Sequence, residues 1–197
     1  MASVRVFPSL RQTRMRLFTA IDLPPAVLRN LTRLVDRLRP YARLRWQPAD
    51  NFHITTKFIG EWPEERLEEL TAALRRLPAR APFRVAVRGL GWFPNERAPR
   101  VFWTGVEAEA GLAKLARETE DALSELGIGR EGRPFAPHLT LARVKERVPL
   151  EALQKAVGEL PSQEFGEFTA ESFYLYLSEL RPQGSVYTKL EGFPFSR

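Results

Sequence analysis

The sequence predicts an α+β fold in which two small, mainly antiparallel sheets face one another and the helices lie outside. Three observations predict it. Strand-like and helix-like hydrophobic periods alternate along the 197 residues. The order strand, helix, histidine-bearing strand occurs twice, which we interpret as a diverged duplication. Few connections have the form of a crossover between parallel strands, so antiparallel pairing is expected.

The first half of the chain is expected to hold two strands and two helices. Residues 16–21 form an apolar strand. A helix follows between Pro25 and Pro40, because proline is tolerated in the first turn and apolar residues then recur at helical spacing. Residues 52–59 form the strand that carries the first histidine, and residues 64–77 form an amphipathic helix.

The second half repeats strand, helix and histidine-bearing strand and then closes with further strands. Glycine and proline gather in the loops at residues 91–99 and 127–137, where they end regular structure. The expected elements are strands at residues 83–90, 100–106, 138–144, 171–180 and 185–191, and helices at residues 109–126 and 150–160.

The chain is expected to form one domain over residues 15–197. No low-complexity linker separates the two halves, so they should pack as one unit. Residues 1–14 follow no structural period and lack the apolar segment of a secretory signal, so they are expected to be a flexible N-terminal extension, with Met15 as an alternative start. No apolar run approaches the roughly 20 residues that span a bilayer, so no membrane association is expected.

The composition limits which kinds of site and which partners the protein can have. The chain has no cysteine, which excludes disulfides, cysteine-ligated metals and thiol nucleophiles and makes the cytoplasm the expected compartment. With 30 Lys and Arg against 24 Asp and Glu, the formal charge is +6. This balance favours polyanionic partners, although a solvated arginine-rich surface explains it equally well.

The only two histidines occupy matching motifs, His53-Ile54-Thr55-Thr56 and His138-Leu139-Thr140-Leu141. Threonine makes up 11 of the 197 residues, so both histidines have a threonine two places later by chance in roughly one case in 300. Because side chains alternate along a strand, each histidine shares a face with its threonine.

Such a pair suits acid–base chemistry at phosphorus. Near neutral pH one histidine can accept a proton while the other donates one, and the threonine hydroxyls can donate hydrogen bonds to phosphate oxygens. Two alternatives are weaker. A metal site would need carboxylates at strand or helical spacing from the histidines, and none is present. The second alternative is that both histidines are structural residues, partly buried and bonded to local hydroxyls. It leaves unexplained why the two histidines occupy matching motifs.

The same residues resemble the paired H-x-T-x motifs of the 2H phosphoesterase superfamily, and within it the RNA 2′,3′-cyclic phosphodiesterases, also called 2′-5′ RNA ligases. One departure is Thr56, where a bulky apolar residue is more usual and which should face away from the site. The resemblance covers the chain from residue 15 onward, through residues 15–24, 45–60, 91–94, 99–103, 137–143 and 175–187.

The resemblance implies a bilobal fold with a pseudo-twofold central groove, and catalysis without cofactor or metal. It implies His53 as proton donor, His138 as proton acceptor, and Thr55 and Thr140 as ligands of the non-bridging phosphate oxygens. Arg143 is a further phosphate contact or else a surface arginine that closes its strand. Lys57 alternates onto the His53 face or is solvated at the strand end. For four aromatic residues two alternatives stay open, stacking on bases of the RNA or packing in the core: Phe18, Trp46, Phe93 and Tyr187.

The implied substrate is RNA with a 2′,3′-cyclic phosphate end, such as a tRNA fragment, opened to a 2′-phosphomonoester by a monomeric enzyme. Two other functions stay open. The groove could bind an RNA end without turnover, although arginine would serve simple phosphate binding better than paired histidines. The reverse reaction, 2′-5′ ligation of RNA ends, would be a side activity because water is far more concentrated than RNA 5′-hydroxyl groups.

Overall fold

A computed structural model describes residues 13–182 and 184–196, which form nine strands, four α-helices and three short 3-10 helices. The strands are β1 (Arg14–Ile21), β2 (Arg45–Trp46), β3 (Ile54–Pro63), β4 (Phe83–Phe93), β5 (Val101–Ala108), β6 (His138–Arg143), β7 (Glu164–Ala170), β8 (Ser172–Arg181) and β9 (Gly184–Pro194). The helices are α1 (Pro25–Leu38), α2 (Leu67–Arg75), α3 (Ala110–Ser124) and α4 (Glu151–Gly158), with 3-10 helices at Arg39–Tyr41, Ala49–Asn51 and Glu64–Arg66.

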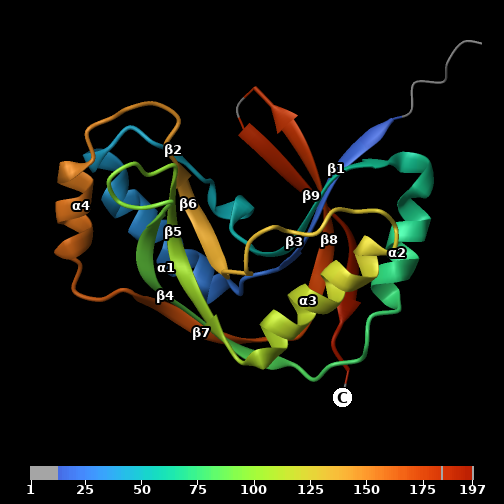
Figure 1. The fold of residues 1–197 in the computed structure, drawn as a ribbon. Coiled ribbons are helices and arrows are strands. Elements are labelled where there is room, and N and C mark those ends of the chain that lie inside the picture. The colour runs from blue at the N-terminus through green and yellow to red at the C-terminus, as the bar shows by residue number, and fades with distance from the viewer. Residues whose placement is uncertain (1–12, 183, 197) are drawn as a thin grey trace, which may run out of the picture.

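The strands form two antiparallel sheets, which confirms the predicted fold class. The first sheet has the order β3-β1-β8-β9 and the second the order β2-β6-β5-β4-β7. Figure 1 shows them as two lobes, with the second sheet beside α1 and α4 and the first sheet beside α2 and α3.

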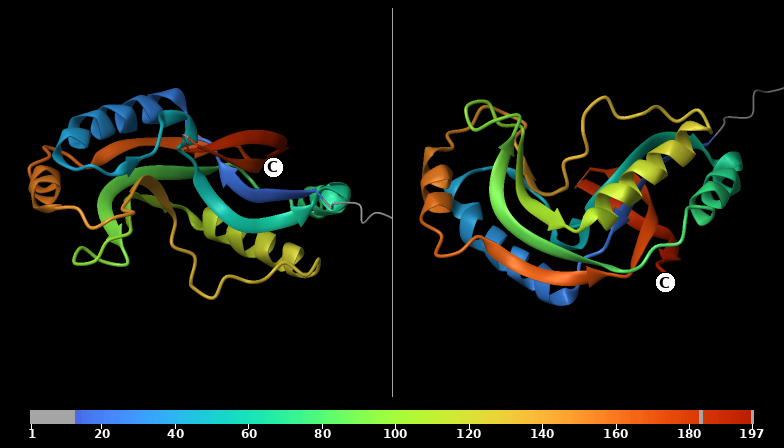
Figure 2. Two further views of the ribbon diagram at one scale, coloured as in Figure 1. Left: turned by 90° about the horizontal axis from the view of Figure 1, so that it is seen from above. Right: turned by 60° about the horizontal axis from the view of Figure 1, so that its bottom comes forward.

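The helices tie the two lobes together. Helix α1 follows β1 of the first sheet but packs on β7 of the second, and α3 follows β5 of the second sheet but packs on β3 of the first. Both helices lie along the outside of the sheets (Figure 2). Each inserts an apolar face at helical spacing, from Val27 to Leu38 in α1 and from Leu112 to Leu123 in α3. One hydrophobic core therefore joins both halves of the chain.

The internal repeat is visible in the strand pairing. In each half a strand pairs with the histidine strand that follows it across a helix, β1 with β3 and β5 with β6. Each histidine strand has a β-bulge, an extra residue, directly after its threonine, at Thr56 in β3 and Leu141 in β6. Strand β3 has a second bulge at Ile59. Because an extra residue reverses the alternation of side chains, residues beyond the bulge change faces.

Thr56, the departure from the usual family pattern, lies at the bulge of β3. Its side chain is buried, and its hydroxyl hydrogen-bonds the buried hydroxyl of Thr19 at 2.7 Å. A buried hydroxyl is costly only when it lacks a partner. Thr56 does not line the groove between the sheets, so it faces away from the site as predicted.

Two strands were not predicted, and several boundaries differ from the prediction. Strand β3 begins one residue after His53 and runs four residues past the expected end, to Pro63. Strand β7 is rich in glutamate and contains Gly166, both unfavourable in strands, and it lies at a sheet edge where such residues are tolerated. Strand β2 has only two residues, too few for a periodic pattern. Arg14, assigned above to the N-terminal extension, begins β1, and the carbonyl of Thr13 accepts a hydrogen bond from the Glu64 amide. The prediction for residues 1–12 lies outside the described residues.

Candidate active site

The two histidine motifs line one groove between the sheets. It has a cavity volume of about 740 Å³ and is walled by strands of both lobes. His53 lies directly before β3 and Thr55 lies within it, and His138 and Thr140 belong to β6, so the structure brings all four predicted side chains together. Strands β3 and β6 contact each other where the two sheets meet.

The two imidazoles are held in the same way. His53 Nδ1 donates to the carbonyl of Asn51 at 2.8 Å, and His138 Nδ1 donates to the carbonyl of Ala136 at 2.8 Å. Each carbonyl belongs to the residue two places before the histidine. Because a carbonyl can only accept, Nδ1 carries the proton in both rings and Nε2 is left for the substrate. The shared geometry gives two equivalent Nε2 atoms, each able to accept a proton or, once charged, to donate one.

The surroundings of the two rings are unequal. His53 packs against Phe18, with ring centroids 4.8 Å apart, and against the edge of Tyr187 at 5.2 Å. His138 has a single aromatic contact of this kind within the described residues, the edge of Phe93 at 4.9 Å. Of the four aromatic residues named from the sequence, Phe18, Trp46 and Tyr187 line the groove, whereas Phe93 supports His138.

Burial lowers the pKa of His53 from 6.5 to about 4. The hydrogen bond to the Asn51 carbonyl and the charge of Asp22 act in the opposite direction, and a positive charge on His138 lowers the pKa further. His138 is therefore close enough to influence the protonation of His53. In the ligand-free protein His53 is neutral at pH 7.

The groove is strongly cationic. Its lining contains Arg16, Arg45, Arg143, Lys145 and Arg181, and among residues 13–182 and 184–196 no aspartate or glutamate lines it. Arg45 and Arg143 are paired across β2 and β6. In a regular strand Arg143 would lie on the face opposite His138 and Thr140, but the bulge at Leu141 turns it into the groove. The site is thus complementary to a phosphate group on a larger polyanion.

Lys57 does not lie where the sequence placed it. The bulge at Thr56 turns Lys57 away from the groove, where its Nζ pairs with Glu120 Oε1 at 2.9 Å and donates to the Gly129 carbonyl at 2.8 Å. Phe58 takes its place on the groove face and is 55% exposed.

Asn51 is a site residue that sequence reasoning missed. Its carbonyl holds His53, and its buried side chain donates from Nδ2 to the carbonyl of Ser185 on β9 at 2.9 Å. Strand β9 also carries Tyr187, which packs on the other side of His53. The position of Asn51, two residues before the histidine, is the signal that would have pointed to it.

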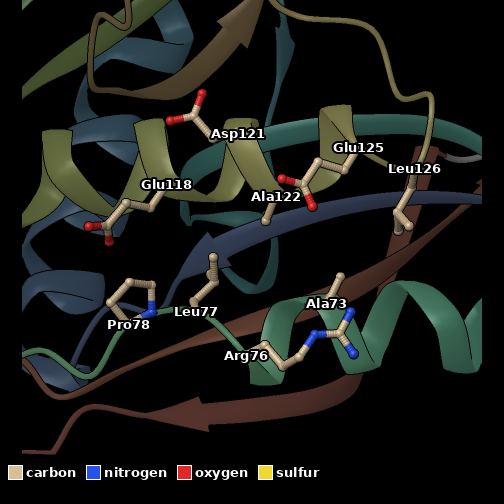
Figure 3. Close-up of a pocket in the computed structure, with 9 residues that line it drawn as sticks. All are labelled: Ala73, Arg76, Leu77, Pro78, Glu118, Asp121, Ala122, Glu125 and Leu126. Atoms are coloured by element: carbon tan, nitrogen blue, oxygen red, sulfur yellow. The ribbon is translucent and has the colours of Figure 1, made fainter.

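A second hollow, with a volume of about 320 Å³, lies between α2 and α3 (Figure 3). Three carboxylates line it from the α3 side, namely Glu118, Asp121 and Glu125, and Arg76, directly after α2, lines the opposite side. It contains no histidine, and its acidic wall is unsuited to a phosphate. The groove is the better candidate for anion chemistry.

Residues 13–182 and 184–196 contain no group of three or more His, Cys, Asp or Glu side chains arranged to hold a metal ion. Within the same ranges, no helix is both long enough and apolar enough to cross a membrane.

Comparison with known proteins agrees with this geometry. The family model for LigT-like phosphoesterases matches residues 21–103 and 105–187, and each segment contains one histidine motif. The RNA 2′,3′-cyclic phosphodiesterase of Thermus thermophilus is 40% identical over 188 residues, 91% of this chain and 89% of the relative. The enzyme of the same name from Archaeoglobus fulgidus is 35% identical over 179 residues, 91% of this chain and 99% of the relative.

Solved structures match over nearly the whole fold. The crystal structure of TT0787 from Thermus thermophilus has a TM-score of 0.79 and 39% identity, covering 92% of this chain and 98% of that one. The structure of Escherichia coli LigT complexed with 3′-AMP has a TM-score of 0.78 and 27% identity, covering 94% and 100%. By its repeated histidine motifs, its two facing sheets and these matches, the chain belongs to the LigT-like phosphoesterase family of the 2H phosphoesterase superfamily.

Proposed function

We propose that the chain hydrolyses RNA 2′,3′-cyclic phosphate ends to 2′-phosphomonoesters. The observation that carries this proposal is the pair of identically held imidazoles, His53 and His138, whose free Nε2 atoms face one cation-lined groove. The names of the Thermus and Archaeoglobus relatives support the substrate.

The reaction needs one base and one acid on opposite sides of phosphorus. His138 Nε2 takes a proton from water, and the water oxygen bonds to phosphorus. The bond from phosphorus to O3′ breaks, and the proton on His53 Nε2 passes to O3′. The product carries a 3′-hydroxyl and a 2′-phosphate, His138 is left protonated and His53 neutral, and exchange with solvent restores both.

Three further side chains serve the phosphoryl group in this proposal. Thr55 and Thr140 donate to the two non-bridging oxygens, because each shares the groove with its histidine. Arg143, turned into the groove by the bulge, adds a charge-assisted contact that stabilises the developing negative charge.

The low pKa of His53 sets a condition on its role. Neutral in the ligand-free protein, His53 can act as the acid only if the substrate raises its pKa. A phosphate charge about 4 Å away contributes about 4 kcal/mol at an effective dielectric constant of about 20. That corresponds to a rise of about 3 in the pKa, enough to protonate His53 near neutral pH. Without such a rise the same geometry would run with the two roles exchanged.

A 12-mer RNA ending in a 2′,3′-cyclic phosphate tests the proposal. The RNA is incubated with the protein in excess EDTA, and the 2′- and 3′-phosphate products are resolved. We expect the 2′-phosphate to form, and we expect loss of at least about a hundredfold in kcat/KM for His53→Ala and for His138→Ala. Tight binding of an RNA that stays intact for hours would instead support an RNA-end binding protein.

Four finer points also stay open to test. The reverse reaction, 2′-5′ ligation, follows from microscopic reversibility and would be detected as a joined product at high concentrations of RNA ends. tRNA fragments as substrates, action as a monomer and a cytoplasmic location stay predictions.

A further inference from the structure

Asp22 is a carboxylate next to His53 that the proposed reaction does not use. Ile21, the last residue of β1, pairs with Ile54, the first residue of β3. Asp22 follows the one and His53 precedes the other, so the antiparallel register places Asp22 opposite His53, where paired side chains share a face. The charge of Asp22 accordingly raises the pKa of His53 against the effect of burial.

The carboxylate of Asp22 is held by side chains of two further strands. Tyr176 of β8 donates its hydroxyl hydrogen to Oδ1, and Lys189 Nζ of β9 pairs with Oδ2. Burial and the hydrogen bond to Asp22 raise the pKa of Tyr176, so its hydroxyl stays protonated and remains the donor. Lys189 in turn lies over the ring of Tyr174, with Nζ 3.7 Å from the ring centroid. Both oxygens of Asp22 therefore have partners, and its charge has a fixed position.

Aromatic rings fill the space between this carboxylate and the imidazole. Tyr176 stacks on Phe18 with ring centroids 5.2 Å apart and ring planes 8° apart, and Phe18 packs on His53 at 4.8 Å. The rings of Tyr176 and His53 are themselves 6.3 Å apart. Because apolar rings screen a charge less than water does, Asp22 acts on His53 across a medium less polar than water. Neither Asp22 nor Tyr176 lines the groove, so the carboxylate does not occupy the place of a phosphate.

The titratable side chains that face His53 come from four strands or their ends: Asp22 after β1, His138 of β6, Tyr176 of β8 and Tyr187 of β9. Of these, Asp22 carries the negative charge. Positive charges, on protonated His138 or on the groove lining, favour the neutral ring of His53. Lys189 offsets part of the charge of Asp22, because it is paired with one of its two oxygens.

We propose that Asp22 is a positioning residue of the reaction, whose carboxylate, fixed by Tyr176 and Lys189 outside the groove, helps His53 to hold its proton until the proton passes to O3′. This inference rests on the proposed function, in which His53 is the acid. It adds a fixed negative charge that is present before the substrate binds, to which the substrate phosphate adds a larger one. Lys189 sets how much of the Asp22 charge reaches the imidazole.

Opposite changes of charge around one carboxylate test the inference. Asp22→Asn keeps the shape and an oxygen for the Tyr176 hydroxyl but removes the negative charge. Lys189→Met keeps an apolar stem and removes the positive charge that offsets Asp22. We expect the pKa of His53, followed by NMR with and without inorganic phosphate, to fall by about 0.5–1 in Asp22→Asn and to rise by a smaller amount in Lys189→Met. A merely structural role would not move the pKa of His53 in opposite directions.

The pH dependence of kcat gives a second measurement, with adenosine 2′,3′-cyclic phosphate as substrate. At about pH 7.5, Asp22→Asn should lower kcat by about three- to tenfold and change KM less than twofold, because fewer complexes hold a protonated His53. The ratio of the variant to wild type should return to one at low pH, where His53 is protonated in both. A ratio that stays constant across the pH range would overturn the inference.

Matched controls are Glu159→Gln and Lys155→Met, which remove the charges of an exposed ion pair at α4, in the other lobe (Figure 1). Both should leave kcat and the pKa of His53 unchanged. Circular dichroism establishes that each variant is folded. If Asp22→Asn does not fold, Lys189→Met alone decides, since the lysine side chain is 43% exposed, and a His53 pKa that does not rise overturns the inference.

The two measurements separate this inference from the proposed function. If wild type hydrolyses the substrate and the two variants leave the pKa of His53 unchanged or move it in the same direction, only the inference fails. If wild type does not hydrolyse the substrate, the proposed function fails. The NMR shifts then still decide whether Asp22 controls the protonation of His53.

Discussion

Lys57 of β3 and Glu120 of α3 form an ion pair beside the loop that precedes His138, and so link β3 to this loop. Lys57 Nζ lies 2.9 Å from Glu120 Oε1, and the lysine side chain is only 2% exposed. The same Nζ holds the Gly129 carbonyl, and Glu120 accepts from the Glu131 amide. Both contacts are to the loop that leads from α3 to His138.

Replacing Lys57 by methionine should therefore destabilise the fold. The substitution keeps the apolar stem but leaves the Gly129 carbonyl without its partner and Glu120, which is 22% exposed, with the Glu131 amide as its remaining hydrogen-bond donor. We therefore expect a loss of about 1–3 kcal/mol in the free energy of unfolding. Urea denaturation followed by circular dichroism measures it. Lys155→Met is the matched control, since its ion pair with Glu159 is exposed and 3.8 Å long, and it should change stability by less than about 0.5 kcal/mol. Equal effects of the two substitutions would contradict the prediction.

The pH dependence of the single histidine variants should reveal which ring is the acid. Wild type should show a bell-shaped profile of kcat/KM. His53→Ala should lose the descending limb, because no acid is left to deprotonate, and keep the ascending limb of the base. His138→Ala should show the reverse. The limbs are measured with adenosine 2′,3′-cyclic phosphate in constant ionic strength buffers. If His53→Ala keeps only the descending limb, the two histidines have exchanged roles.

The placement of the site residues could be predicted from the sequence only as far as the two-residue alternation of side chains along a strand holds. The period of two correctly placed His53 with Thr55 and His138 with Thr140 on one groove, and it correctly separated both sheets from the helices. It failed beyond each threonine, where neither Thr56 nor Leu141 is a residue type that marks a bulge. Both alternatives for Lys57, a place on the His53 face and a solvated strand end, were therefore wrong.

The residues that the sequence left undecided are those fixed by long-range packing. The contact of Asn51 with Ser185 spans 134 residues, and no local pattern encodes it. Arg143 could be assigned to the groove or to the surface until the bulge was known. Strand order and the crossing of α1 and α3 between lobes likewise depend on which apolar faces meet.

Phosphate binding should raise the pKa of His53. Burial holds this pKa at about 4 in the free protein, below the 6.5 of an unfolded chain, so the folded state binds fewer protons between these values. Stability should accordingly fall as the pH drops from 6.5 through 4. The chain has only two histidines, so their ring signals are readily assigned by NMR with His138→Ala as reference. A titration with and without inorganic phosphate should show His53 moving upward, and an unmoved pKa would exclude it as the acid.

The buried hydroxyls of Thr19 and Thr56 form a hydrogen bond whose contribution to stability can be measured. Single and double variants distinguish the cost of leaving one buried hydroxyl unpaired from the stabilisation that the hydrogen bond itself provides. Thr56→Val removes one hydroxyl and leaves the buried Thr19 hydroxyl without a partner, which should cost about 1–3 kcal/mol. Thr19→Val should cost a similar amount for the same reason. The double variant buries two methyl groups in place of the pair and should lose less than either single variant, because no polar atom is then left unsatisfied. Urea denaturation of the four proteins measures the coupling, with Thr188→Val on the exposed face of β9 as control. Additive losses in the double variant would mean that the two hydroxyls act independently and that the hydrogen bond does not hold β1 to β3.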